Sequence, residues 1–259
     1  ALAACATSPA DAKSVTESDV LIKTPDGVCD AHFVHPASGK HPGVLVWPDA
    51  LGIRPAYRTM GRRLAESGYS VLTVNQFYRD SKAPYLPEGA SFADPATRDK
   101  VMKTMGAFTP ELQLRDAPVF VDWLDAQAAV DAKKKLGTTG YCMGGALTMR
   151  TAAVRPERVG AAASFHGGGL ATDKPDSPHL LVPQIKAKYL IAVAENDDSA
   201  EPHAKDVLRA AFAAANNPAE VEVYPAQHGW CAIDSQVFDQ VQADRAWARL
   251  LATFGAALV

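Results

Sequence analysis

The sequence has few cysteines, no long apolar run and no large excess of charge of either sign. Its 4 cysteines in 259 residues lack C-x-x-C spacing, which excludes a disulfide-stapled scaffold and favours a reducing compartment. No run of about 18 apolar residues is present, so no membrane-spanning helix is expected. With 26 Lys and Arg against 29 Asp and Glu, the net charge of −3 offers no basic surface for nucleic acid.

The first residues carry a signal that bears on localisation. The chain begins with Ala, and Leu2 to Cys5 read LAAC, which resembles the lipobox at which bacterial lipoprotein signal peptides are cut. We expect a cytoplasmic protein with a disordered leader over residues 1–18. An exported or lipid-anchored protein held through Cys5 is the alternative. Residues 19–259 are expected to form a single domain.

Short apolar runs alternate with segments of helical periodicity along the rest of the chain. The runs 20–23 and 28–36 predict an opening β-hairpin. Further strands are expected at 43–48, 70–75, 135–141, 159–166, 188–195 and 221–225, and helices at 56–68, 111–127, 142–155, 201–215 and 239–257. Residues 79–109 are rich in Pro, Gly, Ser, Asp and Lys and predict a long surface excursion. The alternation predicts an α/β fold with a doubly wound, mostly parallel sheet and helices on both faces.

A glycine-rich segment places a cysteine where a strand is expected to end and a helix to begin. Gly140, Tyr141, Cys142, Met143 and Gly144 fit the pattern G-x-C-x-G. In a nucleophile elbow the two glycines are needed because side chains would clash in so tight a turn. The N–H groups and positive dipole end of the following helix stabilise a thiolate. Cys142 is therefore a candidate nucleophile, and a buried structural cysteine is the alternative.

Two later segments supply an acid and a base at the ends of expected strands. The run IAVAENDD leads into Asp197 and Asp198, and VEVYPAQHGW leads into His228. A nucleophile followed by an acid and then a histidine is the chain order of α/β-hydrolases. The acid orients the imidazole through one ring nitrogen while the other faces the sulfur. The pattern predicts a triad of Cys142, Asp197 and His228, with Asp198 as a second candidate acid.

These motifs together resemble the dienelactone hydrolase family, also called carboxymethylenebutenolidases, within the α/β-hydrolase fold. The resemblance is carried by GYCMGGA, GVLVWPDALGIRPAYR, NQFYR and YPAQHGW, and covers nearly all of residues 20–255. It implies a thiol hydrolase without cofactor or metal that opens a small-molecule lactone or ester through an acyl-cysteine intermediate. It leaves the oligomeric state open.

The resemblance also implies roles for single residues. Cys142 would be the nucleophile, His228 the base and Asp197 the orienting acid. Asp49 matches the acidic residue that pairs with the resting thiol and helps to switch it to thiolate, where the family has glutamate.

Carried over in the same way, the backbone N–H groups of Met143 and Ala50 would form the oxyanion hole. Arg79 matches the first of two arginines that bind the substrate carboxylate in the family. Ala232 stands at the place of the second, and Arg54 either compensates for it or lies on the surface.

Other conspicuous residues have two readings. Trp230 and Tyr85 either wall the substrate pocket or are ordinary core or loop aromatics. Cys29, His32 and His35 form C-x-x-H-x-x-H, but successive strand residues point to opposite faces, so residue 32 faces away from residues 29 and 35 and no metal site is expected.

Two classes of function stay open from the sequence. The first is an enzyme, either dienelactone hydrolase-like or a broader carboxylesterase or thioesterase. The second is a catalytically inactive hydrolase homologue that binds a ligand. His166, at the end of a predicted strand, either lines the site or supports a Gly-rich turn.

Overall fold

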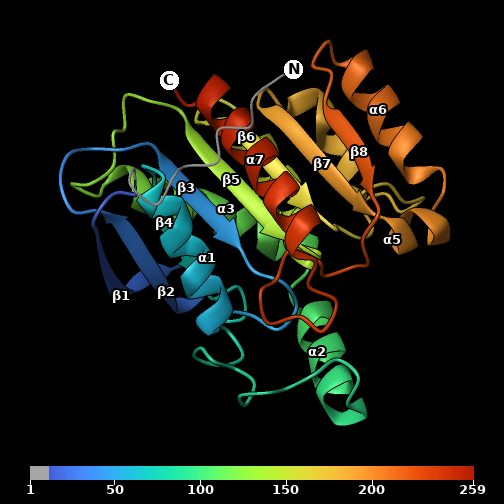
Figure 1. Cartoon of the computed structure of the whole chain (residues 1–259), viewed down its shortest axis with the longest axis horizontal. Coiled ribbons are helices and arrows are strands. Elements are labelled where there is room, and N and C mark those ends of the chain that lie inside the picture. Colours follow the sequence, from blue (N-terminus) through green and yellow to red (C-terminus); the bar gives the residue numbers. More distant parts are fainter. Residues whose placement is uncertain (1–11) are drawn as a thin grey trace.

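The computed structural model describes residues 12–259 and contains an eight-stranded sheet in the order β1-β2-β4-β3-β5-β6-β7-β8 (Figure 1). Strands β3 to β8 are parallel, and β1 and β2 add an antiparallel hairpin at one edge. The strands are β1 (Val15–Thr24), β2 (Gly27–Pro36), β3 (Gly43–Trp47), β4 (Ser70–Val74), β5 (Leu136–Tyr141), β6 (Val159–Phe165), β7 (Lys188–Ala194) and β8 (Glu220–Tyr224). This arrangement confirms the predicted α/β fold with a mostly parallel sheet.

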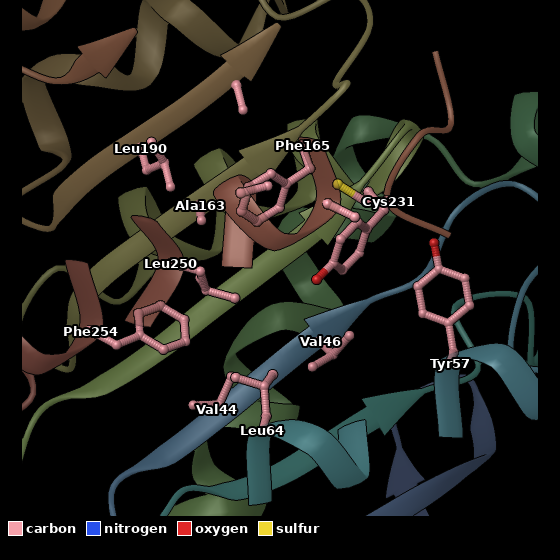
Figure 2. Close-up of a cluster of buried hydrophobic side chains, with 14 of the residues drawn as sticks. Val44, Val46, Tyr57, Leu64, Ala163, Phe165, Leu190, Cys231, Leu250 and Phe254 are labelled. Atoms are coloured by element: carbon pink, nitrogen blue, oxygen red, sulfur yellow. The ribbon is translucent and has the colours of Figure 1, made fainter. Parts of the chain in front are cut away.

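The helices lie on both faces of the sheet. They are α1 (Pro55–Glu66), α2 (Pro95–Ala107), α3 (Pro110–Asp125), α4 (Met143–Val154), α5 (Glu195–Ala200), α6 (Ala204–Ala214), α7 (Gln240–Ala257) and the 3₁₀ helix η2 (Pro178–Gln184). Figure 1 shows α1 and α7 in front of the sheet, with α3 behind it. Between the sheet and the α1/α7 layer lies an apolar cluster that includes Val46, Leu64, Phe165 and Phe254 (Figure 2).

Local sequence explains where the longer helices begin. Pro110 occupies the first turn of α3, and the hydroxyl of Thr109 accepts a hydrogen bond from the Leu112 N–H at 3.4 Å. Asp239 caps α7 in the same way by accepting from the Gln242 N–H at 3.0 Å. Each cap satisfies an N–H group that the helix itself leaves free. The central strands β3 and β4 are buried at every residue, as expected for a parallel sheet covered on both faces.

The opening hairpin is longer than the sequence predicted. Residues 15–18, assigned to a disordered leader, belong to β1 and pair with residues 33–36 of β2. Residues 16–19 are all exposed and polar, because β1 is an edge strand. They gave no apolar signal, so the prediction that the leader extends to residue 18 was wrong for this part.

Three further elements were not predicted. The excursion at 79–109 contains α2, which Figure 1 shows beyond the ends of the parallel strands. The short helices η2 and α5 follow β6 and β7.

In α3 the helix continues through Pro118 to Asp125, although a proline at this position removes one backbone hydrogen bond.

The lipobox-like segment with Cys5 lies outside the described residues. Across residues 12–259 there is no helix with the length and apolarity needed to cross a membrane. Within the same range no cluster of three or more His, Cys, Asp or Glu side chains could hold a metal ion.

The junction of β5 and α4 is packed so closely that it tolerates only glycine. A β-carbon on Gly140 would lie 2.1 Å from the Gly144 carbonyl oxygen. A β-carbon on Gly144 would lie 2.3 Å from the carbonyl oxygen of Trp47, at the end of β3. Because both obstructing atoms are backbone, no rotamer change relieves the clash. The first turn of α4 is therefore held against the end of β3.

Replacing Gly144 by Ala should lower the free energy of unfolding by about 1–3 kcal/mol or more, because the added methyl group must displace the backbone of Trp47. Gly255→Ala is the matched control, because a β-carbon there meets no heavy atom within 4 Å in the exposed face of α7. It should raise stability by up to about 1 kcal/mol. Urea denaturation of both variants measures the difference; equal stabilities would contradict the close packing.

Candidate active site

Cys142 lies between the last residue of β5 and the first of α4 in a strained conformation. Its φ of 56° and ψ of −121° are unusual for a residue with a side chain. The side chain is half-buried and forms no disulfide with another cysteine of residues 12–259. Strain of this kind is typical of a nucleophile elbow, in which the side chain stands clear of the turn.

His228 and Asp197 form the second part of the site. The Nδ1–H of His228, which follows β8, donates to the Asp197 carboxylate in α5 at 2.7 Å. The backbone N–H of His228 donates to the side-chain oxygen of Asn196 at 2.8 Å. Asn196 was missed from the sequence, although it stands beside Asp197 in the run ENDD. It fixes the main chain of the loop that carries the imidazole.

The charge state of His228 reflects its two partners. Burial alone would lower the pKa of His228, but hydrogen bonds with Asp197 and Cys142 outweigh it and raise the pKa to about 10. His228 therefore binds a proton readily in the presence of these groups. Asp198, the other candidate acid, is instead bonded to the Lys205 ammonium at 2.7 Å. The structure brings Asp197 rather than Asp198 to the histidine.

The loop after β3 carries Ala50, one of the expected oxyanion donors. The Gln76 amide donates to the carbonyl oxygen of Asp49 at 2.8 Å, and the Tyr85 hydroxyl donates to that of Ala50. These bonds hold the carbonyl groups of the loop. Among residues 12–259, neither the N–H of Ala50 nor that of Met143 has an acceptor. Two free N–H groups beside the elbow are suited to bind a developing oxyanion.

The Asp49 carboxylate forms its ion pair with Arg54 and not with the Cys142 thiol. Its two carboxylate oxygens accept from the Arg54 guanidinium at 2.7 and 2.9 Å. The same guanidinium donates to the Asp234 carboxylate at 2.6 and 2.9 Å and to the Gly52 carbonyl at 3.2 Å. The expectation that Asp49 pairs with the resting thiol is corrected, because Arg54 offers a bidentate, charge-assisted partner. The bonds to Asp234 tie the loop after β3 to the loop after His228.

Arg79 is likewise occupied by carboxylates of the protein. It donates to both oxygens of the fully buried Asp116 at 2.8 and 2.7 Å, and to Asp26 at 2.9 and 2.6 Å. A buried carboxylate needs a paired cation, and Arg79 supplies it. The expectation of Arg79 as a free guanidinium for a substrate carboxylate is therefore corrected.

Both aromatic side chains that were predicted to line the pocket are buried. Trp230 is fully buried, stacks on Tyr224 with ring centroids 5.2 Å apart and meets His166 edge-on. Tyr85 is 6 % exposed and packs edge-on against Phe77 at 4.9 Å. Neither presents its ring to solvent, so the expectation that they wall an open pocket is corrected. Ala232 is also buried.

A cavity of about 340 Å³ lies between the segment after β4 and α2, and Gln76 in its lining is bonded to the loop after β3. Gln76, which holds that loop, lines it together with Phe77 and Phe108, and Lys100 and Lys103 of α2 complete its other side. The excursion at 79–109 thus forms one wall of the cavity.

The fold and the site define an α/β-hydrolase: a mostly parallel sheet with a glycine-flanked cysteine turn after β5, an acid after β7 and a histidine after β8. A sequence profile of the Dienelactone hydrolase family matches residues 29–258. The chain belongs to the dienelactone hydrolase family, as the sequence motifs predicted.

Relatives and solved structures agree with this assignment. The chain is 26% identical over 205 residues to carboxymethylenebutenolidase of Rhodococcus opacus, covering 78% of this chain and 75% of that protein. It is 25% identical over 221 residues to carboxymethylenebutenolidase 1 of Cupriavidus pinatubonensis, covering 85% and 88%. A Klebsiella pneumoniae subsp. pneumoniae crystal structure, assigned as a dienelactone hydrolase, superimposes with a TM-score of 0.80 at 25% identity, covering 94% of this chain and 99% of that one.

Removing the Asp197 carboxylate should change the proton affinity of His228. In Asp197→Asn the partner that holds Nδ1–H is neutral, so the pKa of His228 should fall from about 10 toward its ordinary value of about 6.5. The proton is then lost at lower pH. NMR titration of the imidazole resonances measures this, with Asp198→Asn as the control. An unchanged titration in Asp197→Asn would contradict the pairing.

Removing the Arg79 guanidinium should destabilise the fold. Arg79→Met leaves Asp116 buried and without its cation, at a cost of about 3 kcal/mol or more. The double variant Arg79→Met, Asp116→Leu should recover most of this loss, because no charge is then left buried. Urea denaturation measures both; a single variant as stable as the parent protein would mean that Arg79 is free for other partners.

Proposed function

We propose that the chain is a cysteine-dependent hydrolase that cleaves a lactone or a carboxylic ester through an acyl-cysteine intermediate. The observation that carries the proposal is the position of His228, whose Nδ1–H donates to Asp197 at 2.7 Å and whose pKa is raised by both Asp197 and the nearby Cys142. This is the arrangement of nucleophile, base and orienting acid that acyl transfer requires. Membership of a hydrolase family supports it.

Before acylation, His228 already holds the proton of the Cys142 thiol, and the thiolate attacks the substrate carbonyl carbon. The carbonyl π electrons move to the oxygen, and the N–H groups of Met143 and Ala50 stabilise that oxyanion. The oxyanion collapses, the carbon–oxygen bond to the leaving group breaks, and His228 returns its proton to the alkoxide. In a lactone the leaving alcohol stays attached to the acyl chain.

Deacylation repeats these steps with water as the nucleophile. His228 takes a proton from water, the hydroxide attacks the thioester, and the collapse of the second oxyanion expels the Cys142 thiolate. His228 keeps this proton beside the thiolate. The products are a carboxylic acid and the alcohol, and the resting pair is restored. Asp197 orients the ring and stabilises its cation at both stages.

The charges of the group around Arg54 favour an uncharged substrate. All five N–H groups of the Arg54 guanidinium are taken by Asp49, Asp234 and Gly52. Since two carboxylates face this one cation, the group as a whole is negative and disfavours an anion nearby. Arg79 is also held by two carboxylates, Asp26 and Asp116, and Asp26 pairs with Arg115 as well, so this second group is balanced in charge. We therefore propose a neutral ester or lactone over a carboxylate-bearing dienelactone.

The decisive measurement is hydrolysis of a p-nitrophenyl ester and of a dienelactone by the parent protein, Cys142→Ala and Cys142→Ser. Cys142→Ala should reduce kcat by at least about a thousandfold, because nucleophile and base act as a unit. The neutral ester should have the higher kcat/KM. Cys142→Ser keeps the elbow and controls for its geometry.

Turnover that survives in Cys142→Ala would contradict the proposed mechanism. Binding of both compounds without turnover in the parent protein would indicate an inactive, ligand-binding homologue. Preference for the dienelactone would contradict the neutral substrate while leaving the cysteine mechanism intact.

A further inference from the structure

His166 is a fully buried histidine in contact with both members of the Cys142–His228 pair, and the mechanism above does not use it. It follows β6 directly and has no exposed surface. Its ring meets that of His228 edge-on, with centroids 5.1 Å apart and an interplanar angle of 61°. On another side it meets Trp230 at 5.1 Å and 69°. The ring therefore lies between the catalytic imidazole and the core.

The main chain of His166 is held in a conformation that side chains rarely adopt. Its φ is 41°, and its N–H donates to the Ala192 carbonyl of β7 at 2.8 Å. The next residue packs on the first turn of α4, since a β-carbon on Gly145 would lie 2.9 Å from the Gly167 Cα. Left-handed backbone at a non-glycine residue persists only where surrounding structure imposes it, and it concentrates at functional sites.

The Nδ1 atom of His166 accepts a hydrogen bond from the backbone N–H of Cys142 at 3.1 Å. The same N–H also donates to the Phe165 carbonyl at 3.0 Å, so the elbow amide has two acceptors. Because Nδ1 accepts, the proton of the neutral ring is on Nε2, which is buried and has no partner within residues 12–259. Burial, with the nearby His228 charge, lowers the pKa of His166 well below its ordinary value.

We propose that His166 is a positioning residue that aligns Cys142 with His228, through its Nδ1 contact to the elbow amide and its ring contact to the imidazole. The inference rests on the proposed function, because it gives His166 a part in that reaction. The second acceptor fixes the peptide from which the Cys142 side chain projects. The neutral ring sets the position of His228 without bringing a competing cation to it.

Two variants separate the contacts of His166. His166→Asn keeps an acceptor near the Nδ1 position, and asparagine tolerates a positive φ. His166→Phe keeps an aromatic ring but removes the acceptor. His203→Phe is the matched control, because His203 is an exposed histidine before α6. Circular dichroism and thermal unfolding establish that each variant is folded.

The readouts are kcat and KM for the neutral ester, and the pH dependence of Cys142 alkylation by iodoacetamide, followed by peptide mass spectrometry. In His166→Phe we expect kcat to fall about tenfold with KM within about twofold, as for a hydrogen bond that orients the reacting group. The alkylation midpoint should move to higher pH, because a misaligned His228 stabilises the thiolate less. His166→Asn should stay within about threefold of the parent kcat.

The titratable groups that face this pair are known from the contacts. Asp197, Cys142 and His166 face the His228 ring, and Tyr141 also faces His166. Equal losses in both His166 variants with an unchanged alkylation midpoint would mean a packing role alone and would overturn the proposal. Slow alkylation of Cys142 in the parent protein would instead contradict the proposed function.

A measurement on the parent protein keeps the proposal testable if the variants fail to fold. Nitrogen-15 NMR of the histidine rings should show one neutral ring with its proton on Nε2 that does not titrate between about pH 5 and pH 9. Assignment to His166 follows from its contact with the Cys142 amide. A His166 ring that titrates in this range, or carries its proton on Nδ1, would overturn the proposal.

Discussion

The close approach of α4 to the end of β3 is the constraint on which the site depends. With Gly140 and Gly144 lacking side chains, the first turn of α4 lies against the Trp47 carbonyl. That contact brings the Met143 N–H and the loop with Ala50 to the same edge of the sheet. The third glycine of the segment, Gly145, packs against Gly167 in the turn after β6. This contact places His166 beside the elbow, where it accepts a hydrogen bond from the Cys142 N–H. One packing requirement thus locates the proposed nucleophile, the two proposed oxyanion donors and the buried histidine.

Electrostatic pairing within the protein occupies both arginines that the sequence motifs suggested for substrate binding. Arg54 and Arg79 stand in the motifs that resemble the family's substrate-binding segments, yet each is engaged by two carboxylates. A guanidinium whose N–H groups are already bonded cannot bind an incoming carboxylate without breaking those bonds. The same pairs stabilise the protein by joining loops that are distant in the sequence.

The sequence allowed the sheet, the elbow and the order of Cys142, Asp197 and His228 to be predicted, because these follow from local patterns. Buried parallel strands are apolar at nearly every residue, and a tight strand-to-helix turn demands glycine. Partner choice could not be predicted in this way. Arg79 meets Asp26 and Asp116 through tertiary packing, and nothing near it in the chain indicates either contact. The burial of Trp230 and the tautomer of His166 depend on the same long-range packing.

The first half of β1 is polar and exposed, and this affects the sheet as a whole. A sheet of eight strands has two edges, and an exposed edge can pair with another chain. On β1, Glu17 and Asp19 form ion pairs with arginines of α1; on β8, Glu220 and Glu222 form them with arginines of α7. Both edges therefore carry fixed charges that oppose the addition of a further strand, which protects the protein against aggregation through its sheet.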